Sequence, residues 1–449
     1  MQESWRFFQP TAECFLLDNL PPQKEFLQLK MRPSTSFTPF SVFHKFLDEK
    51  LVKEIADSVP GGHFDLGERS DREGRISRQI TPRHIWQAIA IQVLLTGNQV
   101  RAKESDPNKH SLQERVQYAK DFLQEKTGEH AYSRNLLLKV ISNCFLEPKH
   151  ASLLSSNFCG ILESLGQFAA GDEKLFHFTG NSSDVRLVIS KPDRLGLWFY
   201  ELCGKLPSGE PFMLDVFLHH NTSNTVSVQS VVNRWLKVLK FVGKEKVPDN
   251  QHPNPKCYLI ADSYYLDKSV RNLMLQEENL DQKFSFSVRG DRMKAEQRMV
   301  HPPDSTPVEG EYKAIVKEDT NETFLYHYDT QKGVGIKYNY ARGFVRSLDK
   351  RKVKERNVPG RVPVYEYYKN SFEICDRFNR RLHDACFPHK RGGNGLKGEF
   401  GCHHDFLMAV ILENTRNTYC YLKSILVKDC NFNHFCELLA IQIFQHSFT

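Results

Sequence analysis

The sequence predicts an α/β protein with a mixed sheet. Apolar residues recur at steps of three and four, the spacing of helices, up to about residue 168. Short runs rich in Val, Phe, Leu and Tyr follow, separated by Gly, Pro, Asn or Ser, which is typical of strands. Helix, strand and helix patterns come next, and this order predicts a sheet that is covered by helices.

The first part of the chain is expected to be a helical block. Residues 40–59, "FSVFHKFLDEKLVKEIADSV", place apolar side chains on one face and predict one helix. In "TPRHIWQAIAIQVLLTG", Thr81 is the predicted N-cap, Pro82 the first helical residue and Gly97 the residue after the helix end. Two further helices, at 134–146 and 155–168, complete the block.

A strand-rich segment is expected to follow this block. We predict a meander of four strands at 174–180, 184–190, 196–204 and 210–220. A helix at 228–243, a buried strand that ends at Asp262 and a helix at 269–276 come next. Residues 295–355 are rich in turns and β formers, which indicates an insertion or a sheet edge. The last predicted helices lie at 367–386, 404–422 and 433–445.

The composition favours a globular protein with two or three domains, because 449 residues exceed one simple core. A formal net charge of +7 is compatible with a polyanionic partner. Eleven scattered cysteines without a Cys-x-x-Cys pair favour a reducing compartment. No apolar stretch reaches the ~20 residues of a membrane span, so we expect no membrane partner.

Three acids occupy positions that ordinary core packing does not favour. Asp172 is expected to open the first strand of the meander, Asp262 follows the apolar run "CYLIA", and Asp376 lies on a later helix. Carboxylates that converge repel one another unless a cation lies between them, and Mg²⁺ and Mn²⁺ prefer such oxygen ligands. A lone Asp at a strand end is more often a cap or a solvated charge, and Glu173 and Asp184 are assigned to that class.

The stretch 172–196 resembles the first catalytic block of the piggyBac-type DDE transposases. That block combines an Asp-Glu pair, Phe-Arg-Gly, Lys-Pro and a glycine. Its counterparts here are Asp172-Glu173, Phe178-Thr179-Gly180, Lys191-Pro192 and Gly196. "CYLIADSYYLDKSVRNLML" is similar to the second block, with its acid at Asp262, and "YKNSFEICDRFNR" is similar to the third, with Tyr368 and Asp376 at the matching places. The similarity runs from about residue 36 to the C-terminus.

The resemblance implies a ribonuclease-H-like mixed sheet with a β-rich insertion, flanked by a mostly α-helical DNA-binding and dimerisation domain built from both sides of the catalytic domain. The expected boundaries are a flexible N-terminal arm at 1–35, the helical domain at 36–168 and 387–449, the catalytic domain at 169–294 and 356–386, and the insertion with a basic loop at 295–355.

The resemblance also implies cut-and-paste DNA transposition by metal-dependent strand cleavage and strand transfer. Asp172, Asp262 and Asp376 would be the catalytic residues and the ligands of two Mg²⁺ or Mn²⁺ ions. Asn379, at the place of the third block's second Asp, is an additional candidate ligand. The implied partners are double-stranded DNA, as element ends and an AT-rich target, and a second copy of the chain in a homodimer.

Two departures from the family pattern support a rival interpretation. Thr179 stands where the first block has Arg, and no Cys-rich zinc-binding block of the family kind follows in the printed sequence. The rival is a domesticated, transposase-derived DNA-binding protein without transposition activity. A metal-dependent nuclease without strand transfer is a third interpretation.

Two further groups of residues are candidates for binding. "KRKVK" is a candidate nuclear import signal, so we expect a nuclear protein, or a strip that contacts phosphates. The candidate DNA-binding residues are Lys191, Lys350, Arg351, Lys352, Lys354, Arg377, Arg380 and Arg381. The candidate zinc ligands, weighed against unliganded side chains, are Cys386, His389, Cys402 and His403.

Overall fold

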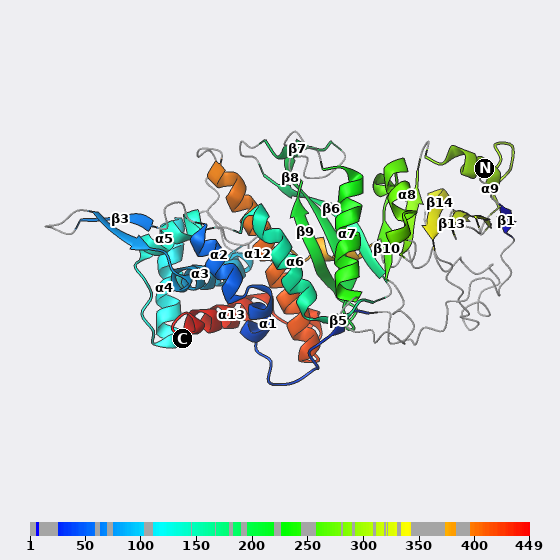
Figure 1. Cartoon of the computed structure of the whole chain (residues 1–449). Helices are drawn as coiled ribbons and strands as arrows, with labels where there is room; N and C mark the ends of the chain where they lie inside the picture. Colours follow the sequence, from blue (N-terminus) through cyan, green and yellow to red (C-terminus); the bar gives the residue numbers. More distant parts are fainter. Residues whose placement is uncertain are drawn as a thin grey trace.

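A ten-stranded mixed sheet crosses the molecule, with helices on both faces and a separate layer of helices at one end (Figure 1). The structure is a computed structural model of the whole chain. It describes residues 6–8, 26–58, 63–69, 75–102, 111–144, 146–166, 168–178, 183–189, 195–219, 226–243, 257–279, 282–289, 292–308, 311–317, 320, 322–329, 334–342, 373–382 and 396–449.

The large sheet has the order β1-β12-β13-β14-β11-β10-β6-β8-β7, and β9 pairs with β8. The strands β6, β10 and β11 are parallel to one another, and the other pairs are antiparallel, which confirms a mixed sheet. Its strands are β1 (Arg6–Phe8), β6 (Phe168–His177), β7 (Val185–Leu187), β8 (Leu195–Lys205), β9 (Pro211–Leu218), β10 (Tyr258–Ala261), β11 (Lys283–Val288), β12 (Tyr312–Lys317), β13 (Glu322–Asp329) and β14 (Val334–Arg342).

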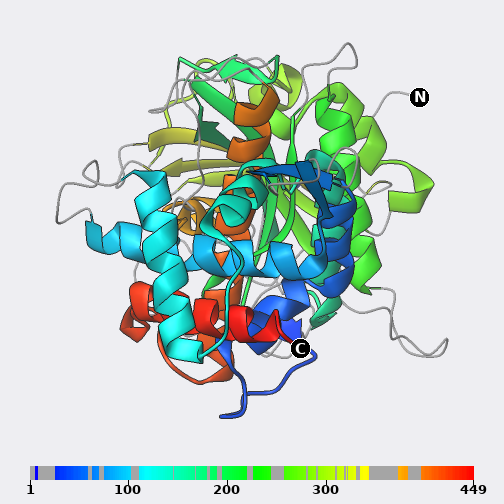
Figure 2. The same ribbon diagram turned by 90° about the vertical axis from the view of Figure 1, so that its left-hand side faces the viewer.

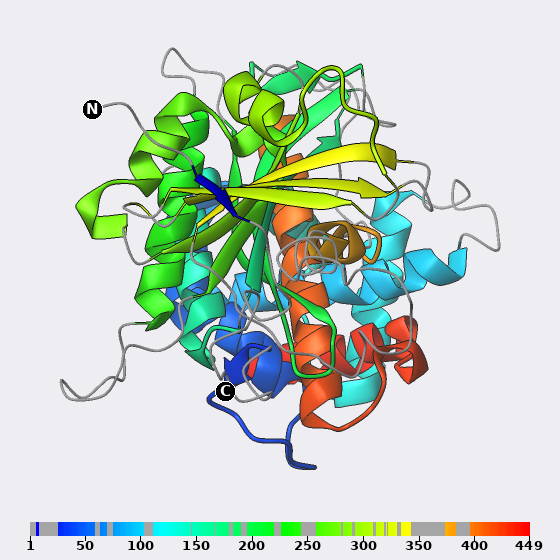
Figure 3. The ribbon, with the colours of Figure 1, turned by 90° about the vertical axis from the view of Figure 1, so that its right-hand side faces the viewer.

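The turn-rich segment after residue 295 continues this sheet. Strands β12, β13 and β14 form an antiparallel set, and β14 pairs with β11. Figure 3 shows these strands in yellow, with β1 beside them. The sequence indicated either an insertion or a sheet edge for this segment. The pairing of its strands with β11 agrees with the sheet edge. Two stretches of the expected N-terminal arm are paired as well, because β1 pairs with β12 and β2 (Gln28–Leu29) with β5 (Leu162–Ser164).

Different helices cover the two faces of the sheet. On one face α6 (Ala151–Gly160) and α7 (Val228–Gly243) lie against β9 and β6. On the other face α12 (Leu396–Leu422) lies against β8 and β9, where the Phe406 ring is 4.1 Å from the Phe199 ring. Asn414 of α12 accepts a hydrogen bond from Met213 N at 2.9 Å and donates one to Met213 O at 3.0 Å.

The helical layer is assembled from both ends of the chain, and Figure 2 shows it facing the viewer. The helix α13 packs along α3, and α1 contacts both α12 and α13. A cluster of Phe46, Phe158 and Phe212 joins α1, α6 and β9 in one core. The helices of this layer are α1 (Pro39–Phe46), α2 (Glu49–Asp57), α3 (Pro82–Ala102), α4 (Leu112–Thr127), α5 (Arg134–Asn143) and α13 (Phe432–His446).

Several helix boundaries differ from the sequence prediction. The helix expected at 155–168 is wrong, because α6 ends at Gly160 and β5 follows, and two other differences have a visible cause. The single helix expected at 40–59 is two helices, because Asp48 caps α2 through a hydrogen bond from Leu51 N at 2.9 Å. The helix α3 begins at Pro82 as predicted but continues past Gly97. A Cβ at Gly97 would lie 2.8 Å from Cβ of Cys436, so this glycine permits close packing against α13 and does not end the helix.

The remaining described elements lie at the margins of the sheet. The helix α8 (Lys268–Met274) contacts α7, and α9 (Lys294–Val300) contacts β12 and β13. A hairpin of β3 (His63–Arg69) and β4 (Arg75–Gln79) extends from the helical layer (Figure 1). Among the described residues, none of the helices combines the length and apolar character that crossing a membrane requires.

Candidate active site

Asp172 lies inside β6 and not at its start. The strand begins four residues earlier, at Phe168, so the expectation that Asp172 opens the strand is wrong; the small apolar residues Ala169 and Ala170 extend the buried strand backwards. Gly171 precedes Asp172, and a Cβ there would lie 2.3 Å from Cζ3 of Trp235 on α7. Close packing of α7 therefore requires glycine beside the first acid.

Asp262 lies beside Asp172 at the end of the neighbouring parallel strand. Ala261 of β10 is in register with Gly171 of β6. Asp262 and Asp172 are the residues that directly follow this pair, on strands that are about 4.8 Å apart. Asp262 is the N-cap of the short helix η4 (Ser263–Tyr265) and accepts a hydrogen bond from Tyr264 N at 2.7 Å. The register places the backbone of the two acids side by side, and their shared role in one site stays a prediction.

Asp376 lies on a helical segment over residues 373–379 that crosses β6 and β8. Cys375 Sγ lies 3.2 Å from the carbonyl oxygen of Ala170, and Asn379 Nδ2 donates to Glu201 Oε2 at 2.8 Å. Asp376, between these two anchors, is exposed. Its helix is thus fixed to the sheet two residues before Asp172. Within the described part of the chain, the three acids do not form a group whose ligand atoms all lie within 4.8 Å of one another.

Glu201 is a fourth acid at this place, and it is not among the site residues predicted from the sequence. It is the cross-strand partner of Asp172 on β8 and is fully buried. Cross-strand partners share one face of a sheet, so Glu201 and Asp172 both face the side on which the 373–379 helix lies. The available signal was an acid within the apolar run "LWFYELCG", since a buried carboxylate requires a partner.

Neutral hydroxyl and thiol groups surround these carboxylates. Tyr265 donates from its hydroxyl to Glu173 Oε2 at 2.8 Å. Burial, followed by the charges of Glu173 and Asp172, raises the pKa of Tyr265 well above its ordinary value. Burial, followed by Cys203 and then by the acids Asp172 and Glu201, does the same to the pKa of Cys375. Glu173, predicted to be a cap, turn or solvated charge, instead has a buried tyrosine as its partner.

The three described arginines of the candidate DNA-binding set have different environments. Arg381 forms an ion pair with Glu210, and Arg377 lies 3.8 Å from the same carboxylate and donates to Gly209 O at 3.3 Å. Both therefore hold the 373–379 helix to the turn between β8 and β9. Arg380 is exposed. The candidates outside the described residues are Lys191, Lys350, Arg351, Lys352 and Lys354.

The candidate zinc residues are only partly described. Cys386 and His389 lie outside the described residues. Cys402 and His403 are buried on α12. Cys402 Sγ lies 3.9 Å from His177 O, and His403 Nδ1 lies 2.7 Å from Leu146 O. The side chains of Cys402 and His403 thus each lie next to a backbone carbonyl, and the two carbonyls belong to different segments of the chain.

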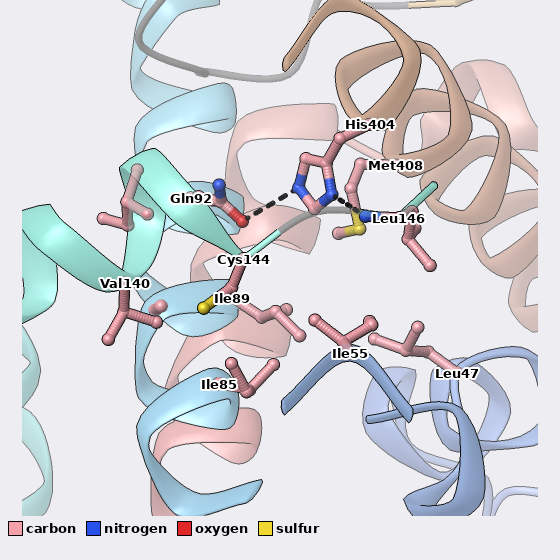
Figure 4. A pocket seen from close by; sticks show the side chains of 12 residues that line it. Leu47, Ile55, Ile85, Ile89, Gln92, Val140, Cys144, Leu146, His404 and Met408 are labelled. Atoms are coloured by element: carbon pink, nitrogen blue, oxygen red, sulfur yellow. Dashed lines mark hydrogen bonds between the residues drawn. The ribbon is translucent and has the colours of Figure 1, made fainter. Parts of the chain in front are cut away.

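A pocket next to these residues lies inside the helical layer, between α2, α3, α5 and α12 (Figure 4). Its lining is mostly aliphatic, and His404 is the polar group that stands out. Leu146 N donates to His404 Nδ1 at 2.9 Å, and His404 Nε2 lies 3.4 Å from Gln92 Oε1. Because both ring nitrogens already have protein neighbours, this pocket is a packing gap in the core.

Comparison with solved structures gives a fold class. The chain has the fold of a DNA transposase of the piggyBac type. It is similar to the chain in a cryo-EM structure of a piggyBac transposase synaptic complex with hairpin DNA. The TM-score is 0.61 and the identity 13%, over 93% of this chain and 83% of that one. No family model and no curated protein matches the sequence. The similarity confirms a piggyBac-type fold with a large mixed sheet, while the ribonuclease-H-like detail and the domain boundaries stay predictions.

Proposed function

We propose that this chain is a piggyBac-like DDE transposase that cleaves and joins DNA strands with a ribonuclease-H-like catalytic domain. The observation that carries the proposal is the register of β6 and β10, which makes Asp172 and Asp262 neighbours. The contact of Cys375 with Ala170 adds the helix of Asp376 on the face that Asp172 shares with Glu201. Acids from two strands and a later helix then serve one phosphoryl-transfer site.

The donor set fits a hard divalent cation. Asp172, Asp262 and Asp376 offer carboxylate oxygens, and Asn379 Oδ1 is buried with no hydrogen-bond donor among the described residues. Oxygen ligands of this kind suit Mg²⁺ or Mn²⁺. When bound, two such ions supply Lewis-acid stabilisation of the attacking and leaving oxygens at phosphorus.

The chain's own residues would position the DNA and the helix of the third acid. Asn379 and Arg381 tie the 373–379 helix to Glu201 and Glu210, which leaves exposed Arg380 to contact a phosphate. Lys191 and the basic run from Lys350 to Lys354 would add phosphate contacts, whose contribution falls as salt rises. Double-stranded DNA as partner, a homodimer and a nuclear location belong to this proposal and are supported by the motif resemblance.

The test is nicking and joining of supercoiled AT-rich plasmid in Mg²⁺ or Mn²⁺ by the full chain and by Asp262→Asn. Loss of one ligand charge is expected to reduce product formation about 10³-fold or more. DNA affinity should stay equal or rise, because a negative charge near phosphate is removed. The control is Asp267→Asn, five residues further on, where Asn can still accept the hydrogen bond from Val270 N.

Two results would count against the proposal. Equal activity of wild type and Asp262→Asn would exclude Asp262 from the chemistry. Tight, salt-sensitive binding of DNA by all three proteins, without any metal-dependent product, would favour the rival interpretation of a domesticated DNA-binding protein.

A further inference from the structure

Two histidines and a glutamate from three helices meet at the surface of the helical layer. His44 Nε2 of α1 lies 3.4 Å from Glu49 Oε1 at the start of α2. His446 Nε2, at the end of α13, lies 2.6 Å from the same oxygen. The three potential ligand atoms all lie within 4.8 Å of one another. Residues almost 400 positions apart in the chain thus direct donor atoms to one point.

Glu49 and His446 have further contacts on the atoms that point away from the cluster. Trp86 Nε1 donates to the other carboxylate oxygen, Glu49 Oε2, at 3.2 Å. Thr449 Oγ1 lies 3.3 Å from His446 Nδ1, the ring nitrogen opposite the cluster. The Phe40 ring lies 4.7 Å from the His446 ring. Metal-binding histidines commonly have such a partner on the second nitrogen, which fixes the ring orientation.

We propose that His44, Glu49 and His446 bind one divalent late transition-metal ion, Zn²⁺ first, with water as the fourth ligand. Two imidazoles and a carboxylate are a ligand set that zinc uses when it keeps an open position. Bonds of about 2.0–2.1 Å to a tetrahedral ion place ligand atoms about 3.3 Å apart. The distance from His44 already has this value, and the distance from His446 requires a side-chain shift below 1 Å.

The orientation and exposure of the cluster agree with a metal site. Glu49 Oε1 faces both imidazoles, while its second oxygen accepts the hydrogen bond from Trp86. Glu49 is 53% exposed, while His44 and His446 are half-buried. An ion can therefore enter from solvent, and a water molecule can complete its coordination.

A metal ion here would fasten the first helices of the layer to the last helix of the chain. The helices α1 and α13 already pack together, and the ion would add a bond that the unfolded chain lacks. Such binding adds to the free energy of unfolding. This inference does not depend on the proposed DNA chemistry.

The experiment is equilibrium dialysis of the full chain against Zn²⁺, with Co²⁺ absorption as a report on coordination. The variants are His446→Ala and Glu49→Gln, which change surface residues. The matched control is His434→Ala, an exposed histidine on the same helix α13. At Zn²⁺ concentrations above the Kd of this site, wild type and His434→Ala should each bind one ion more than His446→Ala and Glu49→Gln. Affinity at this site should fall at least about 100-fold in the variants.

Thermal unfolding gives a second, independent measurement. Zn²⁺ should raise the unfolding temperature of wild type and His434→Ala, and this increment should be lost in His446→Ala and Glu49→Gln. If all four proteins bind the same number of ions with equal affinity, the cluster is a hydrogen-bonded ion pair only and the proposal is wrong. Circular dichroism of the variants establishes that each is folded.

Discussion

Glu201 gives a physical reason for one departure from the transposase motif. This fully buried carboxylate accepts a hydrogen bond from Asn379 Nδ2, at the place where the third motif block has an acid. An aspartate at 379 would set two carboxylates against each other in a buried site, which is unfavourable without a cation. The amide supplies a donor to Glu201 and keeps one oxygen as an acceptor.

The sequence placed Asp172 and Asp262 on or after neighbouring strands, whereas its signal for Glu201, an acid within an apolar run, did not assign that residue to the site. Asp172 and Asp262 each stand in or after an apolar strand with a known motif order, so their meeting could be predicted. Glu201 stands in a strand that is otherwise apolar, and only its pairing with Asp172 gives it a place in the site. The pairing of residues as far apart in the chain as Asp172 and Glu201 depends on tertiary structure, which periodicity does not report.

Glu413 on α12 is expected to make stability depend on pH. Burial raises the pKa of this carboxyl to about 7, although Arg416 and Arg381 lower it, whereas its ordinary value is 4.5. The folded protein then keeps a proton that the unfolded chain releases. The resulting stability is present below pH 4.5 and is lost as pH rises through 7. The free energy of unfolding should fall by about 3 kcal/mol over this range.

Glu413→Gln removes this titration and should flatten the dependence, with the largest gain in stability at pH 8. Urea unfolding at pH 5 and pH 8 measures the effect. Exposed Glu277 serves as the control, because Glu277→Gln should leave the pH dependence of wild type unchanged. If the free energy of unfolding of Glu413→Gln differs between pH 5 and pH 8 as much as that of wild type, Glu413 does not cause the pH dependence.

At the scale of elements, the break between α1 and α2 depends on one cap. Asp48 accepts a hydrogen bond from Leu51 N, and the capping satisfies a donor that the helix leaves unpaired. Asp48→Ala should lower the free energy of unfolding by about 1 kcal/mol in a urea titration.

Asp57 is the matched control, because it lies at the opposite end of the same helix. An acid there is unfavourable to the helix dipole, so Asp57→Ala should be neutral or slightly stabilising. If the two substitutions destabilise equally, the cap does not explain the break.

The types of most elements followed from the sequence, while several ends did not. Period 3.6 predicted the helices α3, α5, α7 and α13, since each buries a regular stripe. The end of α3 was missed because Gly97 is a C-cap signal by type, and its contact with Cys436 is visible only in the fold. The start of β6 was missed because the small residues before Asp172 favour no single structure.

At the scale of the whole molecule, a buried carboxylate of the sheet joins two helices that cover the same face, α6 and α7. Asp215 of β9 is fully buried and receives two hydrogen bonds from Arg234 of α7, each at 2.8 Å. Ser155 of α6 donates to the same carboxylate. Arg234→Met leaves this buried charge without its cation and should cost about 3–5 kcal/mol in the free energy of unfolding.

The exposed Lys237 on the same helix is the control. Lys237→Met should change the free energy of unfolding by less than about 0.5 kcal/mol. A loss below about 1 kcal/mol for Arg234→Met would mean that the carboxylate is protonated or hydrated when the arginine is removed.

The asparagine contacts of α12 also limit how copies of this chain can assemble. Asn414 occupies both backbone groups of Met213, and Asn417 donates to the carbonyl of Pro211. These are the groups of β9 that point away from β8, and in a bare edge strand they would recruit a strand from another molecule. With side-chain amides in that position, a strand of another molecule cannot pair with the first residues of β9.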